Sequence, residues 1–200
     1  MNKILIIVFS AVIAASVITS GALFFLGGGS SDITVVETPA QTQAERPDVI
    51  PDPEANMVKL PEGANIAEGK PLRAGEVTDV YAANNANDGE VTTYWESRGF
   101  PAEITIDLEN EYNVQTVAVR LNPSALWEAR VQTFEVSASS DGENFTVVVP
   151  ETPHGFDPGT GNTVRLDFSA VKARYIRFTF TATTAGRTGG AQAAEIEVYE

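Results

Sequence analysis

Apolar and polar residues alternate in several short stretches of this chain, and this pattern limits the fold more than any other feature. In residues 104–108, the apolar side chains of Ile104, Ile106 and Leu108 are separated by polar ones. A β-strand turns successive side chains to opposite faces, so this spacing gives a strand one face for a core and one for solvent. The same alternation recurs in residues 117–121, 134–138, 164–168, 176–180 and 196–198. Since this region has no sustained helical periodicity, the sequence predicts an all-β sandwich.

A tight turn is predicted where Asp141 and Gly142 stand between two of these apolar stretches. Asp-Gly is a common turn pair because both residues tolerate the left-handed backbone that short hairpins require. We therefore expect residues 134–139 and 145–149 to form a β-hairpin.

The first 26 residues differ in character from the rest of the chain. Residues 4–26 carry no charge, and as a helix they would be roughly 34 Å long, enough to cross the hydrocarbon core of a bilayer. Lys3 precedes them and no basic residue follows before Arg46, which places the N-terminus in the cytoplasm. The sequence predicts one transmembrane signal-anchor helix, residues 1–26, that contacts the membrane and leaves the domain extracytoplasmic. The alternative is a signal peptide cleaved near residues 20–22, and the domain would then be secreted.

Residues 27–61 are expected to form an acidic tether. They open with glycine and serine and continue with prolines at positions 39, 47, 51, 53 and 61. Such a composition buries too little apolar area to fold by itself, and the prolines keep the chain extended. The ordered domain is then expected to span residues 62–200.

Charge and residue types argue against several classes of function. The net charge is -14, whereas nucleic-acid binding needs a basic surface. The chain has no cysteine, and His154 is its only histidine, which excludes thiolate chemistry and most zinc sites. Close carboxylate pairs such as Asp107 and Glu109 occur, but no pattern in the sequence indicates a catalytic cleft around them. We therefore expect a protein that is not an enzyme and does not bind nucleic acid.

Residues 84–97 combine turn-forming residues, oxygen donors and large aromatic residues. Asn87, Asp88 and Gly89 favour a tight, irregular backbone. With the Asp88 carboxylate and the Thr93 hydroxyl beside carbonyl groups, the loop offers the hard oxygen ligands that Ca²⁺ prefers. One carboxylate holds Ca²⁺ weakly, so a second would have to come from elsewhere in the chain. Without it, the stretch is a polar turn between two strands.

A series of short motifs runs through residues 64–200. In chain order they are Asn65-Ile66-Ala67, Ala86-Asn87-Asp88-Gly89, Tyr94-Trp95-Glu96-Ser97, Ile106-Asp107-Leu108, Ser140-Asp141-Gly142, Ala173-Arg174-Tyr175-Ile176-Arg177-Phe178 and Ala194-Glu195-Ile196-Glu197-Val198-Tyr199. Their order resembles the discoidin domain, or coagulation-factor C-type domain, and the related family 32 carbohydrate-binding modules. Residues 123–130 and 156–163 are similar to bacterial modules attached to glucan-degrading enzymes. The resemblance implies a jelly-roll β-sandwich of the galactose-binding-domain-like kind.

The resemblance also implies one structural Ca²⁺. Asp88 and Glu195 would be its carboxylate ligands, and Glu195 would be the distant carboxylate that the loop lacks. Thr93 would contribute its hydroxyl and carbonyl groups. Backbone carbonyl groups would come from Asn85, Glu90 and Ala194. Two carboxylates with several neutral oxygens suit Ca²⁺ better than Mg²⁺, which requires a strict octahedron.

The same resemblance implies a carbohydrate ligand. Sugars stack their C–H faces on exposed aromatic rings, and Trp127 lies in a loop where a core tryptophan would be out of place. Arg130 could donate to adjacent hydroxyls, although an internal ion pair is the alternative. The further candidate contacts are Trp95, Glu96 and Phe156, with packing as the alternative for Trp95. The chain lacks the His–Arg–Asn set of galactose-binding members, which points away from galactose.

Taken together, these features predict a non-catalytic, membrane-anchored carbohydrate-binding module with a structural calcium site. Its partner would be a glucan or a cell-surface polysaccharide. The alternative is a protein-binding adhesin or surface-assembly module that binds no sugar, because the fold alone does not fix the function.

Overall fold

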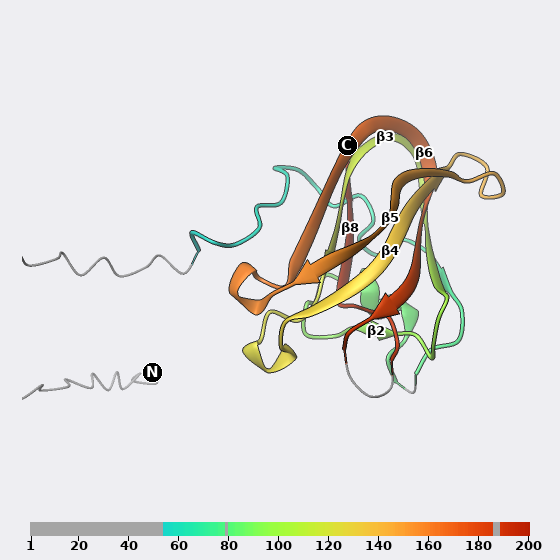
Figure 1. Cartoon of the computed structure of the whole chain (residues 1–200). Coiled ribbons are helices and arrows are strands. Elements are labelled where there is room, and N and C mark those ends of the chain that lie inside the picture. Colours follow the sequence, from blue (N-terminus) through green and yellow to red (C-terminus); the bar gives the residue numbers. More distant parts are fainter. Residues whose placement is uncertain (1–53, 79, 186–188) are drawn as a thin grey trace, which may run out of the picture. The chain divides into compact units, whose positions relative to one another are not determined.

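Two long strands, β3 (Ala102–Arg120) and β6 (Thr163–Thr183), frame the protein in its computed structural model, which describes residues 54–78, 80–185 and 189–200. They pair antiparallel, with register shifts between Asp107 and Tyr112 and between Val114 and Thr116 of β3. Both strands bend over near the first shift, as the arch in Figure 1 shows. Each strand therefore contributes one half to each of two layers.

The remaining strands complete these two layers. In the first layer the order is β1 (Leu72–Ala74), the first half of β3, the second half of β6, β4 (Arg130–Ser139) and β5 (Thr146–Phe156). In the second layer β8 (Glu195–Tyr199) pairs with the second half of β3, which pairs with the first half of β6. The prediction of an all-β, jelly-roll sandwich is confirmed.

The core lies between the layers and includes most of the apolar residues whose alternation predicted the strands. Ile104, Ile106 and Leu108 are fully buried on β3, and Phe178 and Phe180 are fully buried on β6. Their polar neighbours in sequence are exposed, as Glu103 is, or half-buried, as Thr105 and Arg177 are. Burying each such side chain contributes about 1.5–3 kcal/mol, so these aromatic and aliphatic residues are the main source of stability.

The predicted hairpin joins β4 and β5. Asp141 Oδ1 accepts hydrogen bonds from the backbone N–H groups of Glu143 (2.9 Å) and Asn144 (2.8 Å), and Gly142 has a φ of 77°. However, β5 continues past the predicted end at residue 149 to Phe156, through Pro150 and Pro153. These prolines are tolerated because β5 is the outer strand of its layer, where one row of N–H groups needs no partner.

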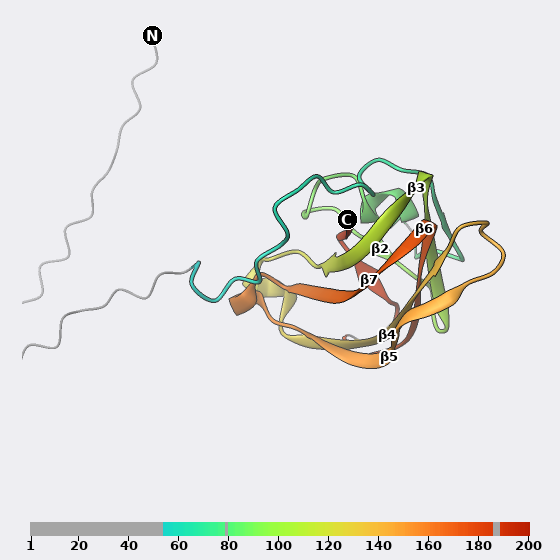
Figure 2. The same ribbon diagram turned by 90° about the horizontal axis from the view of Figure 1, so that it is seen from above.

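The end of the sandwich away from the bend is formed by loops and short elements, and we call it the loop end: residues 81–97, 122–130 and 189–194. It contains the 3₁₀ helices η1 (Ala83–Ala86) and η2 (Ala125–Trp127), and β2 (Trp95–Glu96), which pairs with β7 (Gln192–Ala193). Figure 2 shows β2 and β7 side by side. A side chain at Gly190 would overlap the carbonyl oxygen of Ser97, so β7 approaches β2 as closely as glycine allows.

Two residues just before the expected start of the domain at residue 62 form hydrogen bonds with it. Val58 N–H donates to the Thr160 carbonyl (3.3 Å), and Arg165 Nη1 donates to the Lys59 carbonyl (2.9 Å). The predicted membrane span, residues 1–26, and the tether up to residue 53 lie outside the described residues and stay predictions. Among the residues that the structure describes, no helix has the length and apolar character to cross a membrane.

Candidate functional site

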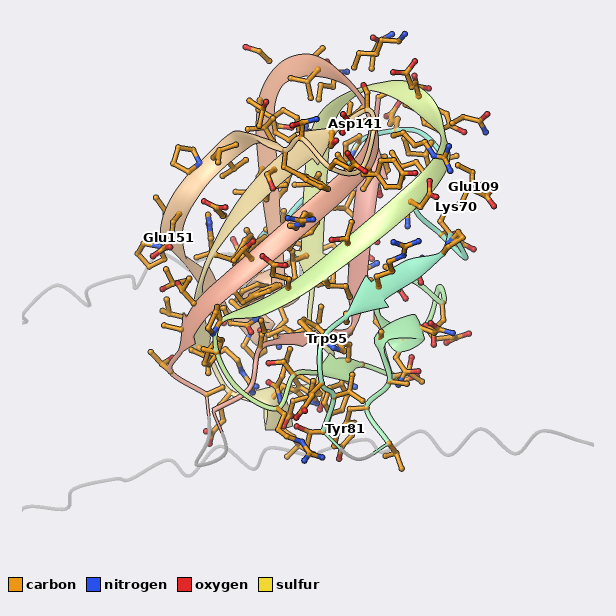
Figure 3. The ribbon with its side chains drawn as sticks, turned by 90° about the vertical axis from the view of Figure 1, so that its right-hand side faces the viewer. Lys70, Tyr81, Trp95, Glu109, Asp141 and Glu151 are labelled. Atoms are coloured by element: carbon orange, nitrogen blue, oxygen red, sulfur yellow. The ribbon has the colours of Figure 1, made fainter. Side chains whose placement is uncertain are left out.

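Three aromatic side chains line up at the loop end. The rings of Tyr81 and Tyr94 are stacked, with centroids 4.3 Å apart, and Tyr94 meets the ring of Trp127 edge-on at 4.7 Å. Figure 3 places Tyr81 at this end, below Trp95, and far from Lys70, Glu109 and Asp141 near the bend. Burial, together with the contact to Tyr81, raises the pKa of Tyr94, so its phenol keeps its proton.

Trp127 is carried by the short helix η2. Ser124 caps this helix, since its Oγ accepts a hydrogen bond from the Leu126 N–H at 3.3 Å. The Trp127 side chain is half-buried, packing partly against the core, while the neighbouring Leu126 is 91% exposed. The loop therefore presents one anchored ring and one aliphatic side chain to solvent.

Arg130 contacts both the ring and the backbone of this tryptophan. Its Cζ lies 5.0 Å from the centre of the Trp127 ring, and its Nη2 donates to the Trp127 carbonyl oxygen. Nε donates to the Glu128 carbonyl (3.3 Å), and Nη1 donates to Gln192 Oε1 (2.6 Å). Burial lowers the pKa of Arg130. The guanidinium group is thus engaged within the protein, as the internal alternative anticipated, although through carbonyl and amide oxygens rather than through an ion pair.

Glu96 contacts Gln192, the residue to which Arg130 donates. It is buried, and its Oε2 accepts a hydrogen bond from Gln192 Nε2 at 2.6 Å. Gln132 holds the backbone of Gln192 through two hydrogen bonds of 2.8 Å. The Gln192 N–H donates to Gln132 Oε1, and Gln132 Nε2 donates to the Gln192 carbonyl. Glu96 and Gln132 therefore position Gln192, which in turn accepts from Arg130.

These groups surround a hollow that we call the Trp127 hollow. Tyr94, Leu126, Trp127, Arg130 and Gln192 line it, and its volume is about 270 Å³. This is close to the lower limit of about 300 Å³ for small-molecule sites. Aromatic and aliphatic surface beside a few polar groups is the combination that binds a sugar ring.

The structure corrects three of the expected ligand contacts, the first of which is the buried Glu96, bonded to Gln192. Trp95 and Phe156 are each only 1% exposed, so neither can stack on a ligand. The Trp95 ring instead packs against Phe180, with centroids 5.7 Å apart, and Phe156 lies opposite Arg130 in the β4–β5 pair. Trp95 is thus a packing residue, which was the alternative expected from the sequence.

Three residues that line the hollow, Tyr94, Leu126 and Gln192, were not predicted from the sequence. Tyr94 precedes the buried Trp95 in an extended segment, so the alternation of faces would have indicated that the two rings point apart. Gln192 comes from the other end of the chain, and the sequence contains no signal that brings it to Arg130.

The predicted oxygen ligands also meet at the loop end. The Thr93 hydroxyl lies 2.7 Å from Asp88 Oδ2 and 2.9 Å from the Glu90 carbonyl oxygen. Glu195, at the start of β8, accepts hydrogen bonds through Oε1 from the N–H groups of Gly89 (2.8 Å) and Glu90 (2.9 Å). Asn85 lies in η1, which contacts β8, and Ala194 precedes Glu195. The structure thus brings the loop that carries Asp88 and Thr93 into contact with Glu195, the distant carboxylate.

The electrostatics of this cluster fit a hard cation. Burial and the contact with Asp88 raise the pKa of Glu195 to about 8, because two carboxyl groups in contact resist ionising together. A divalent cation would relieve that repulsion. Among the described residues, no group of three or more His, Cys, Asp or Glu side chains could hold a metal ion. An ion here would therefore rely on two carboxylates and neutral oxygens, a set that suits Ca²⁺.

Comparison with known proteins finds one matching family and several similar solved structures. A family model described as F5/8 type C domain matches residues 71–196, from just before β1 into β8. Chitosan-binding module 1 from a chitosanase/glucanase of Paenibacillus sp. IK-5 is 26% identical with a TM-score of 0.58, and the match covers 69% of this chain and 100% of the module.

Two further structures show the same likeness. The CBM32 of AlyQ, solved with 4,5-unsaturated mannuronic acid, is 26% identical with a TM-score of 0.54, covering 65% of this chain and 94% of the module. A family 89 glycoside hydrolase from Clostridium perfringens is 27% identical with a TM-score of 0.58, covering 68% of this chain and only 14% of that enzyme. The family match spans more than half of the sequence and accounts for every layer of the sandwich, so this chain belongs to the F5/8 type C domain family, also called the discoidin family.

Proposed function

We propose that this protein is a non-catalytic carbohydrate-binding module that holds a polysaccharide at the Trp127 hollow. The observation that carries the proposal is the half-buried row of Tyr81, Tyr94 and Trp127, held by Arg130 and lying beside the exposed Leu126. A rigid, neutral aromatic surface binds a sugar ring at little cost in conformational entropy.

A neutral or amino-sugar polymer, such as a glucan or chitosan, suits the charges at this hollow. Arg130 is the one basic residue among those lining it, and its donors already serve Glu128, Trp127 and Gln192. The chain as a whole carries a net charge of -14. An acidic polymer would therefore be repelled without gaining a free cation to pair with. The similar Paenibacillus module is described as chitosan-binding.

The calcium site would act as a brace for this binding surface. Asp88, Thr93, Glu195 and the Glu90 carbonyl, with the carbonyl groups of Asn85 and Ala194, would hold Ca²⁺ and join the first loop to β8. Tyr94 follows Thr93 directly, so the brace would also limit the movement of the aromatic row. Residues 1–26 would anchor the module in the membrane, and residues 27–61 would extend it toward its polymer outside the cytoplasm.

The test is a pull-down of the full chain on insoluble β-glucan, chitosan, chitin, peptidoglycan and alginate. A detergent without a sugar headgroup keeps the apolar residues 4–26 in solution and leaves the site free. Trp127→Ala removes the platform, and Tyr112→Ala is the matched control, since Tyr112 is also a half-buried aromatic residue packed on the core but lies near the bend.

We expect binding to β-glucan or chitosan, its loss in Trp127→Ala, and its retention in Tyr112→Ala. Equal binding by Trp127→Ala and the unchanged protein would rule out the Trp127 hollow as the site. A folded protein that binds none of these polymers would instead favour the adhesin or surface-assembly alternative.

A further inference from the structure

We propose that a second hollow beside the Trp127 hollow binds another sugar unit of the same polymer, so that the domain recognises a stretch of chain rather than a single ring. This inference rests on the proposed function. The second hollow has a volume of about 510 Å³ and lies where β4 begins and β5 ends. Arg130, Gly155, Asp157, Thr160 and Thr184 are among its walls. We call it the Gly155 hollow.

The two hollows are neighbours because Arg130 lines both of them. Arg130 begins β4 and is paired with Phe156, the last residue of β5, while Val131 is paired with Gly155. On the other side, Arg130 lies only three residues after Trp127 in the sequence. A chain of linked sugars that stacks on Trp127 can therefore pass Arg130 and continue into the Gly155 hollow.

The floor of the Gly155 hollow is bare backbone. Gly155 is exposed in β5, and a Cβ built on it would meet no heavy atom within 4 Å. Glycine weakens a strand unless close approach is needed, since it has no side chain to pack and loses more entropy on folding. No turn or positive φ requires glycine at this position. What its missing side chain provides is room for a ligand against the strand.

The groups around this floor match a hydroxyl-bearing ring. Asp157 uses Oδ1 to accept from the Gly159 N–H at 2.7 Å, and as an exposed residue it presents its carboxylate to solvent. The Thr160 hydroxyl donates to the Asp157 carbonyl at 3.0 Å, and Thr184 Oγ1 accepts from Val131 N–H at 2.8 Å. Carboxylate and hydroxyl oxygens accept hydrogen bonds from sugar hydroxyls or a protonated amine. This set again suits a neutral or amino sugar rather than a uronic acid.

The structure offers a substitution that narrows the second hollow at a residue that does not line the first. Gly155→Val fills the floor with a β-branched side chain, which a strand accommodates well. We therefore expect Gly155→Val to fold with unchanged or slightly higher stability. Gly75→Val is the matched control, because Gly75 is also exposed, has no positive φ, would meet nothing within 4 Å and lines neither hollow.

The experiment is titration calorimetry of the full chain, in the same detergent, with two sets of probes: glucosamine oligomers and β-1,3-glucose oligomers of one to six units. We expect affinity for at least one set to rise about tenfold or more between two and five units. Gly155→Val should abolish this rise while leaving affinity for the shortest ligand unchanged. Gly75→Val should behave as the unchanged protein, and Trp127→Ala should lose binding at every length.

Three results would overturn the inference. Equal affinity for short and long oligomers would show one subsite and leave the proposed function intact. A rise with length that persists in Gly155→Val would place the second subsite elsewhere. If no oligomer binds the unchanged protein, the proposed function fails for these sugars, and the second subsite fails with it.

Discussion

The guanidinium carbon of Arg130 lies 5.0 Å from the centre of the Trp127 ring, while Nη2 of the same group donates to the Trp127 carbonyl oxygen. One side chain therefore holds both the ring and the backbone of the residue that we assign to sugar stacking. A cation–π contact that is partly shielded from water contributes about 1–2 kcal/mol, and the planar group reaches three acceptors at once.

Arg130→Lys should therefore weaken polymer binding even though it keeps the charge. A lysine offers a single ammonium group, which cannot reach the Trp127 and Glu128 carbonyls and Gln192 together. We expect a loss of about 1.4 kcal/mol in binding free energy, or tenfold in affinity, by titration calorimetry. Arg98→Lys is the control, since Arg98 is exposed and its guanidinium group forms a long ion pair, 3.7 Å, with Glu76. An unchanged affinity in Arg130→Lys would show that Trp127 needs no such support.

Calcium removal should lower the midpoint of thermal unfolding. A ligand that binds only the folded state at a hundred times its Kd stabilises it by about 2.7 kcal/mol. We expect added Ca²⁺ to raise the midpoint of chelator-treated protein by several degrees, and Asp88→Asn or Glu195→Gln to abolish most of that rise. Glu143→Gln, in the exposed β4–β5 turn, is the control carboxylate. Identical midpoints with chelator and with calcium would speak against the site.

A loss of stability at mildly acidic pH is expected from His154. Burial lowers the pKa of this histidine below its ordinary value of 6.5, and its ring packs on Phe134 with centroids 4.2 Å apart. The unfolded chain then takes up the proton first, so stability falls as pH drops below about 6.5. Urea unfolding at pH 7.5 and 5.5 measures this, and the decrease should be smaller in His154→Gln. Because the two proteins share all other titrating groups, an equal decrease in both would exclude His154 as its source.

Gly190→Ala should destabilise the domain strongly. The added Cβ would overlap the Ser97 carbonyl oxygen and crowd the Glu96 side chain, so β7 would have to move away from β2. Such overpacking costs about 1–3 kcal/mol, measurable by urea unfolding. The movement would also displace Gln192 from Arg130 and weaken sugar binding. Gly155→Ala, which introduces a Cβ into open space, should leave the unfolding free energy within about 0.5 kcal/mol. Equal stability of the two variants would mean that the loop end is more compliant than its packing indicates.

The strands that the sequence predicted well are those with one buried face, because alternation of apolar and polar residues indicates such a strand directly. Ile104, Ile106 and Leu108 lie on a strand with one buried face, and alternation alone indicates that face. The extension of β5 to Phe156 could not be predicted, because a proline is tolerated in a strand only when that strand is at an edge, and edge position depends on the whole topology.

The candidate site was predictable only in part, for the same reason. Resemblance to a family indicated the oxygen cluster, and the structure brings Asp88 and Glu195 into contact although they are far apart in the sequence. The neighbours of Trp127 were less accessible to sequence reasoning. Gln192 reaches Arg130 through the pairing of β7 with β2, a contact between distant segments that leaves no local pattern. The burial of Trp95 likewise depends on Phe180, which lies far away in the sequence.

The bend that β3 and β6 share has a mechanical consequence for the proposed binding of a polymer. Because each strand passes without interruption through both layers, the layers stay joined at the bend when force acts on the loop end. Complete separation of the layers would require β3 and β6 themselves to unfold at the bend. Force on the polymer should therefore be borne by the whole domain until it yields in one step, and single-molecule pulling should show one rupture peak rather than two.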